Sequence, residues 1–551
     1  MFRRPFHPAM APCLVAALLI GSSILAAADV PPVKVWETKA VIPTYLAGAP
    51  ELNPMFFFGR SSQGAQAPVY PYAMYDSLTG KKVDKSYKIV YLENEYLRIG
   101  ILPEIGGRIF EGLDKTNNYN FFYRQHVIKP ALIGLLGAWI SGGVEWNIPH
   151  HHRASTFSPV QYSIEENADG SRTVWVGELE VRQRMRWAVG YTLRPGKAYL
   201  EASLRIVNRT PEVNTMLSFA NVAVHANENY QVIFPPSTQY GTGHSKRSFQ
   251  KWPVSNTFPG AEPGKGVDIS WYKNHISSNS VFAWNYSDDF FAGYDHGKQA
   301  GTMSVADHNV VPGKKFFTWG NGQSGRSWDG ILTDDDGPYL ELMVGAYSDN
   351  QPDYSWLQPY ETRSFSMSWY PFRDIGGVKK ANLDAAVNLD VSNGNAKVGF
   401  YTTSARPAAT VMLKAGSKVL LQEKIAIDPG KPYVKQVPVP AGTDEHDLVA
   451  SISDGGKELV SYSPIRLKPE PMPEGTVRPG PPADVKTNEE LYLIGRKHRP
   501  RNHRLHESQV RRSRAVSPQG DCQAHGPVHY AERRGGDLLP RGHLESRGQD
   551  R

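Results

Sequence analysis

Hydrophobic and polar residues alternate in many short runs from about Val33 to Phe372. The pattern is plainest in residues 87–102, 172–195 and 198–210, where β-branched and aromatic residues tend to occupy every second position. Gly, Asn, Asp and Pro separate the runs, and almost no segment has the spacing of an amphipathic helix. Alternation with period two over many short segments is typical of antiparallel sheets packed face to face. We therefore expect an all-β domain built from large antiparallel sheets.

A second group of short, strand-like runs occupies about residues 382–467. Its length and strand spacing fit a small immunoglobulin-like β-sandwich. The following residues, 468–482, are rich in proline, which favours an extended, semi-rigid linker. Thr487 and Glu490 then have the spacing of a capping box at the start of an amphipathic helix.

That helical pattern stops at Arg496, where the sequence becomes rich in Arg, His, Gly and Ser. A natural disordered basic tail is one interpretation. We favour a frameshift or truncation product, because the composition changes abruptly just after a helix start. The region Arg496–Arg551 carries 13 Lys+Arg and 6 Asp+Glu, so its net charge equals the +7 of the whole chain. The rest of the chain is neutral, and we expect no nucleic-acid partner.

The N-terminal residues have the parts of a secretory signal. Arg3 and Arg4 precede an apolar run, residues 13–25, and three alanines, residues 26–28, supply the small side chains that a signal peptidase requires. The apolar run is shorter than the ~20 residues that span a bilayer. We expect a secreted or periplasmic protein that has no membrane segment after signal cleavage.

These observations divide the chain into five parts. We expect a signal peptide at residues 1–28, a large β-sandwich at 29–375, a small β-sandwich at 376–467, a Pro-rich linker at 468–486, and an abortive helix start with a basic tail at 487–551. The two cysteines, Cys13 and Cys522, fall outside both β domains. Thiol chemistry and cysteine-ligated zinc are therefore excluded from those domains.

The segment Asn94–Ile109 has the pattern N-x-x-L-x-I-x-I-L-P-x-x-G-G-R-I, which resembles the first core strands of aldose 1-epimerases and other galactose mutarotase-like proteins. Gly106 and Gly107 permit a tight turn between two strands, and Arg108 would stand beside the open sheet face. A plain Gly-Gly hairpin with a solvated arginine is the alternative. The resemblance implies a large antiparallel β-supersandwich that holds a sugar on one open face.

The segment Pro338–Phe372 is similar to the last strands of the same superfamily, in which a strand glutamate acts as general base. The matching residue is Glu341, and period two places the leucines on either side of it in the core if its own side chain faces the cleft. A solvated strand glutamate is the alternative. The DNQP motif that follows implies substrate binding by Asp349 and Gln351.

Two departures from the superfamily pattern concern the catalytic acid. Mutarotases carry a histidine just before a Phe-Asn-Leu strand, whereas this chain has Leu217 at the comparable position. Their His-Gly-Gly is replaced by Ser-Gly-Gly at residues 141–143. His225, four residues after Asn221, is a candidate replacement acid.

The run GGVEWNIPHHHR offers a second set of site residues. An indole face stacks on the C–H face of a pyranose, while carboxylate, amide and imidazole groups make directional hydrogen bonds to its hydroxyls. In an extended strand, adjacent histidines point to opposite faces, so at most the first and third of the triplet share one site. No clear metal-ligand spacing is present, and we expect no metal and no cofactor. The candidates in this run are Glu145, Trp146, Asn147, His150 and His152.

The wider sequence, from about Val33 to Gly495, resembles the bacterial family of domain of unknown function 5107, which often precedes tetratricopeptide-like repeats. The resemblance implies a carbohydrate-active protein that binds a sugar or glycoside on the supersandwich face, and the signal-like N-terminus implies export. Action at the anomeric carbon, by glycoside hydrolysis or epimerisation, is one function that this fold would allow. For epimerisation, Glu341 would be the base, and His225, His150 or His152 the acid. For glycoside hydrolysis, Glu341 and Glu145 would form the carboxyl pair. A non-catalytic carbohydrate-binding or assembly protein is the alternative.

Overall fold

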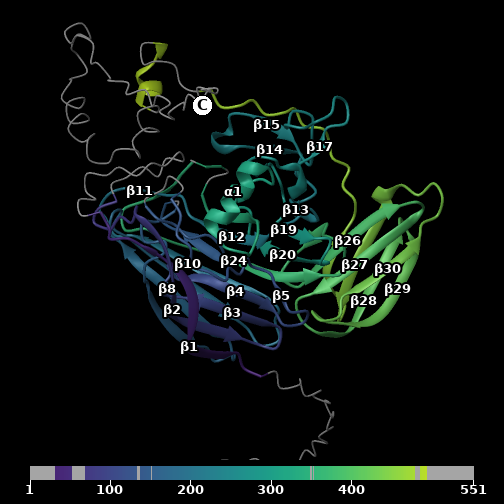
Figure 1. Cartoon of the computed structure of the whole chain (residues 1–551). Coiled ribbons are helices and arrows are strands. Elements are labelled where there is room, and N and C mark those ends of the chain that lie inside the picture. The colour runs from purple at the N-terminus through teal and green to yellow at the C-terminus, as the bar shows by residue number, and fades with distance from the viewer. Residues whose placement is uncertain are drawn as a thin grey trace, which may run out of the picture. The chain divides into compact units, whose positions relative to one another are not determined.

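The computed structural model describes residues 31–51, 69–132, 137–150, 152–347, 350–351, 353–477 and 484–492 (Figure 1). The expected signal peptide and basic tail lie outside these residues. The chain divides into two units, Met1–Gly480 and Pro481–Arg551. In the second unit, residues 488–492 are helical, and the backbone N–H of Glu490 donates to Thr487 Oγ1 at 3.1 Å. The helix start and its capping residue are thus as the sequence predicts.

The first unit contains a 12-stranded antiparallel sheet. Its strands are, in spatial order, β1 (Lys34–Ala47), β2 (Leu78–Glu93), β3 (Leu97–Leu102), β4 (Arg108–Asp114), β6 (Val144–Asn147), β12 (Phe219–His225), β22 (Tyr339–Gly345), β21 (Gly313–Thr318), β18 (Asn279–Trp284), β14 (Tyr240–Thr242) and β15 (Phe249–Lys251), with β5 (Tyr119–Asn120) paired to β4. Neighbours such as β6 and β12 are far apart in sequence, so the sheet is assembled from non-local pairs.

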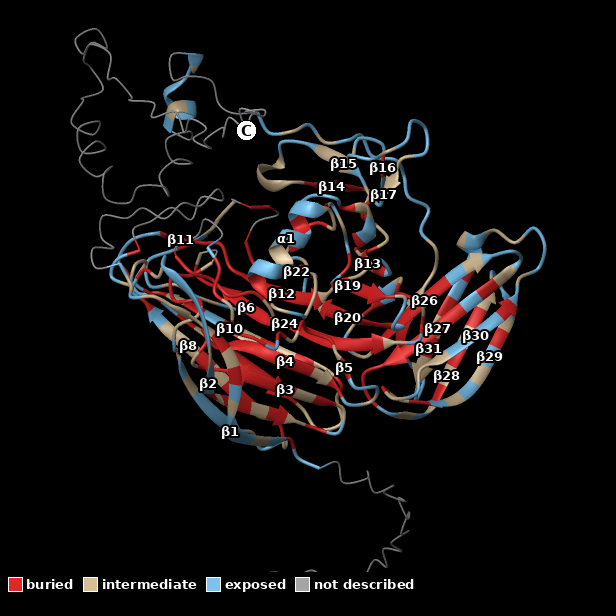
Figure 2. Ribbon diagram, viewed as in Figure 1, coloured by how far each residue is buried: buried red, intermediate tan, exposed pale blue. Residues whose placement is uncertain are grey.

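An 8-stranded antiparallel sheet packs against the first sheet. Its strands are, in spatial order, β13 (Tyr230–Ile233), β19 (Phe290–Asp295), β20 (Ala300–Val305), β24 (Thr362–Arg373), β10 (Leu200–Asn208), β9 (Met185–Leu193), β8 (Arg172–Glu180) and β7 (Gln161–Glu166). One hydrophobic core contains residues of both sheets, and Figure 2 shows buried residues along their central strands. The expected all-β supersandwich is therefore confirmed.

Alternation along β22 shows how one strand serves both faces of the sheet. Leu340 and Leu342 point into the core between the sheets, as the sequence predicts. Glu341 and Met343 therefore point to the opposite side, which we call the outer face. The same alternation along β12 places Val222 in the core.

The tight turn between β3 and β4 also follows the sequence prediction. Gly106 and Gly107 have φ values of 66° and 71°, which lie in the left-handed region that favours glycine. A Cβ at Gly106 would also lie 2.2 Å from the carbonyl oxygen of Thr156. This turn sets the start of β4 at Arg108.

The small sandwich has two four-stranded sheets. The first sheet contains, in spatial order, β25 (Lys380–Ala381), β26 (Ala385–Ser392), β27 (Asn395–Thr402) and β30 (Tyr433–Pro438). The second contains β29 (Lys418–Ile427), β28 (Arg406–Ala415), β31 (Leu448–Asp454) and β32 (Lys457–Tyr462). It has its own core, and a further cluster joins residues such as Tyr401 of β27 to Tyr370 of β24. The small sandwich is therefore packed against the large one.

Shorter elements complete the described residues. They are β11 (Asn214–Met216) paired with β23 (Ser355–Leu357), β16 (Val254–Ser255) paired with β17 (Val267–Asp268), helix α1 (Gln323–Leu332), and 3-10 turns at His244–Lys246, Tyr272–Asn274 and Glu445–Asp447. No helix in these parts of the chain is both long and apolar enough to cross a lipid bilayer.

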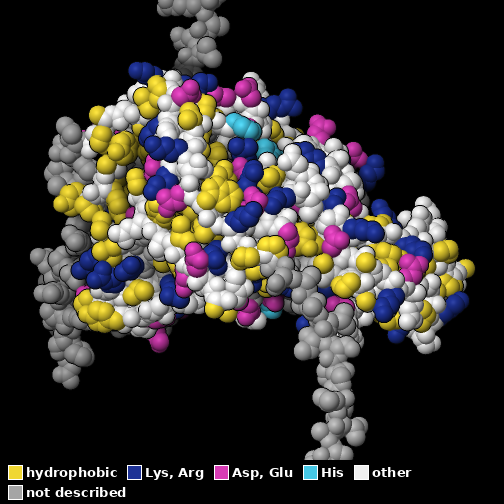
Figure 3. Space-filling view, turned by 90° about the horizontal axis from the view of Figure 1, so that it is seen from below, with side chains coloured by type: hydrophobic (Ala, Val, Ile, Leu, Met, Phe, Trp, Pro, Cys, Tyr) yellow, Lys and Arg dark blue, Asp and Glu magenta, His cyan; other side chains and the backbone are white. Residues whose placement is uncertain are grey.

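Charged side chains of both signs are interspersed on the face drawn in Figure 3. Several are paired elsewhere on the surface, as Lys115 is with Glu93 at 2.8 Å. Exposed pairs of this kind contribute at most about 1 kcal/mol each. Burial between the sheets is thus the larger contribution to stability.

Replacing Leu342 with alanine should lower the free energy of unfolding by about 2–5 kcal/mol, because this leucine is 3% exposed and lies between the sheets. Leu179→Ala is the matched control, since Leu179 is 42% exposed on β8 and should change that free energy by less than ~0.5 kcal/mol. Urea denaturation measures both. Equal losses in the two variants would contradict the two-layer packing.

Candidate functional site

Strand register assembles a row of polar residues across the outer face of the 12-stranded sheet. Glu145 on β6 is paired with Asn221 on β12, Asn221 with Met343 on β22, and Met343 with Lys315 on β21. Glu341 stands two residues from Met343 on the same face of β22. We call Glu145, Asn221, Lys315 and Glu341 the row. Four strands from distant parts of the sequence thus bring two carboxyls, an amide and an amine together.

Glu145 is buried and accepts several hydrogen bonds. Trp139 Nε1 and His152 Nδ1 each donate to Oε2 at 2.9 Å. Thr156 Oγ1 donates to Oε1, and Asn221 Nδ2 lies 3.5 Å from Oε2. Both carboxylate oxygens therefore accept hydrogen bonds from side chains of the protein.

These partners keep Glu145 ionised. Burial by itself would raise the pKa of this carboxyl, but the charge and hydrogen bond of His152 and the charge of Arg108 outweigh it and hold the pKa at about 2. Arg108 is one residue from the Ile109–Val144 pair that joins β4 to β6, so its backbone lies beside Glu145. Its Nη1 donates to the carbonyl oxygens of Ser141 (3.1 Å) and Gly142 (3.0 Å).

The pKa of Glu341 is shifted in the opposite direction to that of Glu145. Burial raises the pKa of its carboxyl, and the charges of His152 and Lys315 only partly oppose this effect. Asn221 hydrogen-bonds this carboxyl as well as Glu145, and the hydroxyl of Tyr339 lies 3.4 Å from Oε1. The pKa values of two neighbouring carboxyls are thus shifted in opposite directions, an arrangement that also occurs in acid–base sites.

His152 is hydrogen-bonded to the first of these glutamates. Its Nδ1 is held by Glu145, while its charge acts directly on Glu341. The side chain is 12% exposed, more than that of either carboxyl. A carboxylate that fixes one ring nitrogen orients the other, which is how a catalytic imidazole is commonly positioned.

Lys315 is a site residue that the sequence analysis missed. Its Nζ donates to Gln351 Oε1 at 2.8 Å and to His244 Nε2 at 3.2 Å. Burial lowers the pKa of this amine to about 7, against the opposing effect of Glu341. Burial and Lys315 together lower the pKa of His244 to about 3. The available signal was a charged residue inside the apolar strand GKKFFT.

Several buried polar atoms of this region have no hydrogen-bond partner within the described protein. They are Arg108 Nε and Nη2, both side-chain amide atoms of Asn147, and Asn221 Oδ1. Buried polar groups are normally paired, so each such atom calls for a partner. This set holds both donors and acceptors, which matches a ligand rich in hydroxyl groups.

Trp146 was predicted to bind substrate, and that prediction is wrong. Its side chain is fully buried between the sheets, where Nε1 donates to the Tyr191 hydroxyl and the ring packs 6.0 Å from that of Trp369. Trp146 follows Glu145 directly, so period two turns it to the opposite face. It cannot offer its indole to a ligand on the outer face.

Three other predicted residues, His225, His150 and Asp349, are not hydrogen-bonded to Glu145 or Glu341 in any described contact. His225 is on the outer face of β12, where it pairs with Tyr339, two residues from Glu341, and its ring packs 4.4 Å from that of Tyr123. Burial lowers the pKa of His225 to about 4. His150 contacts Thr215 rather than Glu145. Asp349 lies outside the described residues.

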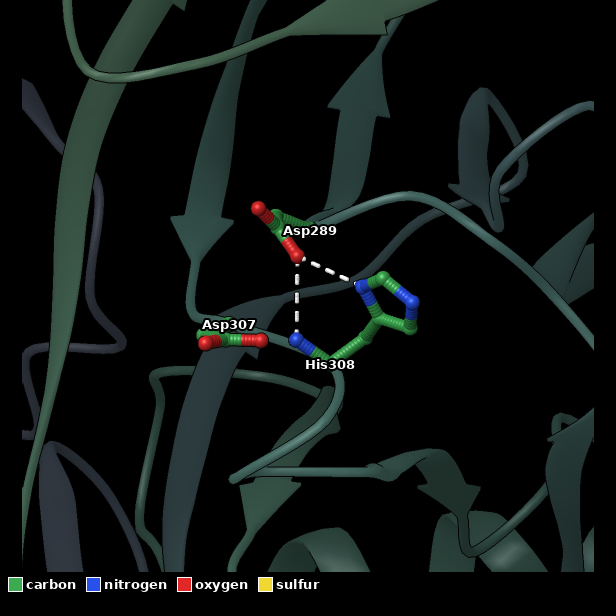
Figure 4. Close-up of side chains that lie close together, drawn as sticks. All are labelled: Asp289, Asp307 and His308. Carbon is green, nitrogen blue, oxygen red and sulfur yellow. Dashed lines mark hydrogen bonds and ion pairs between the residues drawn. The ribbon is translucent and has the colours of Figure 1, made fainter.

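A second cluster, away from the row, has donor types that suit a metal ion. Asp289, Asp307 and His308 place one potential ligand atom each within 4.8 Å of one another. Figure 4 shows that Asp289 is already engaged by the ring and the backbone N–H of His308, at 2.8 and 2.9 Å. The charge of Lys314 also acts on Asp289. This cluster is explained by local loop contacts.

Comparison with known proteins gives two family matches. The profile of the domain of unknown function DUF5107 matches residues 65–372, and that of the second domain of YphG-like protein matches residues 380–462. The boundary between the two matches falls between β24 and β25. Each match therefore covers one of the two sandwiches.

Several solved structures are similar in fold. A TPR-domain containing protein from Parabacteroides distasonis has a TM-score of 0.54 and 24% identity, and the match covers 62% of this chain and 55% of that one. This chain thus spans about half the length of that protein. Galactose mutarotase-like proteins from Clostridium acetobutylicum and Lactobacillus casei have TM-scores of 0.37 and 0.34 and identities of 12% and 9%, over 52% and 51% of this chain and 96% and 99% of theirs.

The low pKa of Glu145 predicts how stability depends on pH. Its folded pKa is about 2 and its ordinary value 4.5, so its contribution is complete above pH 4.5 and is lost as the pH falls toward 2. The loss should approach ~3 kcal/mol. Urea denaturation at pH 6 and pH 3 should show a smaller difference in the free energy of unfolding for Glu145→Gln than for wild type. Glu228→Gln, at an exposed position, should behave as wild type; an unchanged difference in Glu145→Gln would refute the assignment.

Proposed function

Because the chain belongs to the DUF5107 family and has the galactose mutarotase-like fold, we propose that it binds a sugar on the outer face and acts at the anomeric carbon. The fold itself indicates only a sugar-related function, since folds are shared by proteins of different activity. The proposal therefore depends on the residues of the row. We further propose that the protein works outside the cytoplasm, as the expected signal peptide implies.

The observation that carries the proposal is the hydrogen bond of His152 Nδ1 to Glu145, beside a second buried carboxyl, Glu341, on which the charge of His152 also acts. Anomer exchange needs a base for the proton of the C1 hydroxyl and an acid for the ring oxygen. Glu341 would take the hydroxyl proton while His152 gives a proton to the ring oxygen. The bond between C1 and the ring oxygen then breaks, and C1 becomes an aldehyde carbon. Rotation about the C1–C2 bond and reversal of both transfers yield the other anomer.

Glu145 would act as a positioning residue in this scheme. Its carboxylate holds His152 Nδ1 and so orients the imidazole ring, through which a proton would be exchanged with the sugar. Hydrolysis would instead require Glu145 as nucleophile or base. Its oxygens already accept bonds from Trp139, His152 and Thr156. Epimerisation is thus better supported than two-carboxylate hydrolysis.

The unpaired buried atoms of Arg108, Asn147 and Asn221 support a carbohydrate as the ligand. A sugar hydroxyl both donates and accepts, so one ring could serve guanidinium, amide nitrogen and amide oxygen together. Gln351, which accepts from Lys315, extends the same polar region. The sugar would be recognised by hydrogen bonds to its ring hydroxyls.

A non-catalytic carbohydrate-binding protein is the second candidate. Leu217 stands where mutarotases carry their acid histidine, and the binding role needs no replacement for it. The same unpaired polar atoms would hold the sugar in either case. Anomer exchange separates the two functions, because binding alone does not speed it.

We predict that the protein accelerates exchange between the α and β anomers of an aldose, measured by exchange NMR across a panel of sugars. Glu341→Gln and His152→Gln should each reduce the rate about 10²–10⁴-fold, because each removes one proton-transfer group. His225→Gln removes the alternative acid and should leave the rate within about twofold, because His152 is assigned that role. Glu228→Gln, at an exposed position, is the control and should behave as wild type. Sugar binding without exchange would favour the binding protein, and loss of rate in His225→Gln alone would contradict the assignment.

The rate should also depend on pH in a defined direction. Glu341 must be ionised to act as a base, and burial raises its pKa above the ordinary value of 4.5. The exchange rate should therefore rise with pH along a limb whose midpoint lies above 4.5. A pH–rate profile measures this midpoint, and a limb centred below 4.5 would contradict the role of Glu341.

A further inference from the structure

Residues 468–477, which we call the strap, lie against the large sandwich. Gln239 Nε2 donates to the carbonyl oxygen of Lys468 at 2.9 Å, and the Tyr240 hydroxyl donates to that of Glu470 at 2.6 Å. Asn285 Nδ2 donates to the Glu470 carboxylate at 2.8 Å. This Pro-rich segment is therefore attached to the end of the sheet at which β14 begins and β18 finishes.

The far end of the strap is attached to the 3-10 turn His244–Lys246. The Thr476 backbone N–H donates to the Lys246 carbonyl oxygen at 2.7 Å, and its hydroxyl donates to the Ser245 carbonyl oxygen. A Cβ at Gly475 would lie 2.0 Å from the carbonyl oxygen of Arg247. Only glycine allows this approach, so the main chain of the strap lies in direct contact with the main chain at the end of the turn.

The same turn supplies contacts of the candidate site. His244 accepts a hydrogen bond from Lys315 Nζ at 3.2 Å. The Ser245 N–H donates at 2.7 Å to the carbonyl oxygen of Gln351, whose side chain accepts from the same amine at 2.8 Å. Lys315 is thus held by two residues that the turn positions.

The backbone of the turn His244–Lys246 has an unusual conformation that contacts from the strap stabilise. Ser245 and Lys246 have φ values of 66° and 51°, in the left-handed region that non-glycine residues rarely adopt. Such conformations persist only where surrounding contacts determine them. The Thr476 bonds fall on the carbonyl oxygens of these two residues.

We propose that the strap is a positioning element of the sugar site: Gly475 and Thr476 hold the turn, and the turn holds His244 and Gln351 against Lys315. This inference rests on the proposed function for its effect on turnover. Its structural part, the protection of Lys315, does not depend on any sugar. Residues that follow the two sandwiches would therefore influence the site without touching a ligand.

The test uses the full chain with Gly475→Ala, which forces the strap away from Arg247, and Thr476→Val, which removes only the hydroxyl bond. Val477→Ala is the control, because Val477 is 90% exposed beside the same contact. Thr476→Ser should restore the wild-type behaviour. Labelling of Lys315 by an amine reagent, read by mass spectrometry, should rise about tenfold in the first two variants and stay unchanged in the others.

Anomer exchange is the second readout. Gly475→Ala should lower kcat about tenfold with a smaller change in KM, since misplaced groups act mainly on the chemical step. Unchanged labelling of Lys315 in both strap variants would overturn the proposal, and so would raised labelling with unchanged kcat. Raised labelling in a protein whose wild type exchanges no anomers would uphold the strap and reject only the proposed function.

Discussion

The period-two alternation of four central strands is the constraint on which the rest of this structure depends. In β6, β12 and β22 every second side chain enters the core between the two sheets, and β21 contributes Phe316, so the residues between these positions share the outer face. Hydrophobic burial thereby sets the register, and the register places Glu145, Asn221 and Lys315 in one row. The packing and the candidate chemistry are two results of the same pattern.

Burial and neighbouring charges then shift the pKa values of the ionisable residues in the row. The charge of Glu145 is compensated by His152 and Arg108, so its pKa is lowered and it stays ionised. Glu341 and Lys315 are buried with weaker compensation, so burial raises the pKa of the carboxyl and lowers that of the amine, which favours the neutral form of each. Incompletely compensated charges lower stability. Proteins retain such groups where catalysis or binding uses their shifted pKa values. The row is therefore better explained by function than by stability.

The sequence was sufficient for the fold class, for the turn at Gly106 and Gly107, and for the outward direction of Glu341, because these follow from local alternation and from glycine. The same rule, applied strictly, also separates Trp146 from Glu145, since adjacent strand residues cannot share a face.

Other features required the tertiary pairing. Lys315 and His244 come from segments that meet the row only through non-local register, and no local pattern specifies which strands become neighbours. The same register puts His225 two residues from Ala223, the partner of Glu341, which the sequence did not specify. The contact between Thr476 and the turn likewise joins segments about 230 residues apart.

The crystal structure of this protein with a bound monosaccharide would test the central claim most directly. We predict a sugar on the outer face, with its C1 hydroxyl within hydrogen-bond distance of Glu341 and its ring oxygen near the imidazole ring of His152. Its remaining hydroxyls should meet the unpaired atoms of Arg108, Asn147 and Asn221. A sugar bound elsewhere, with Glu341 and His152 making no contact to it, would contradict the account.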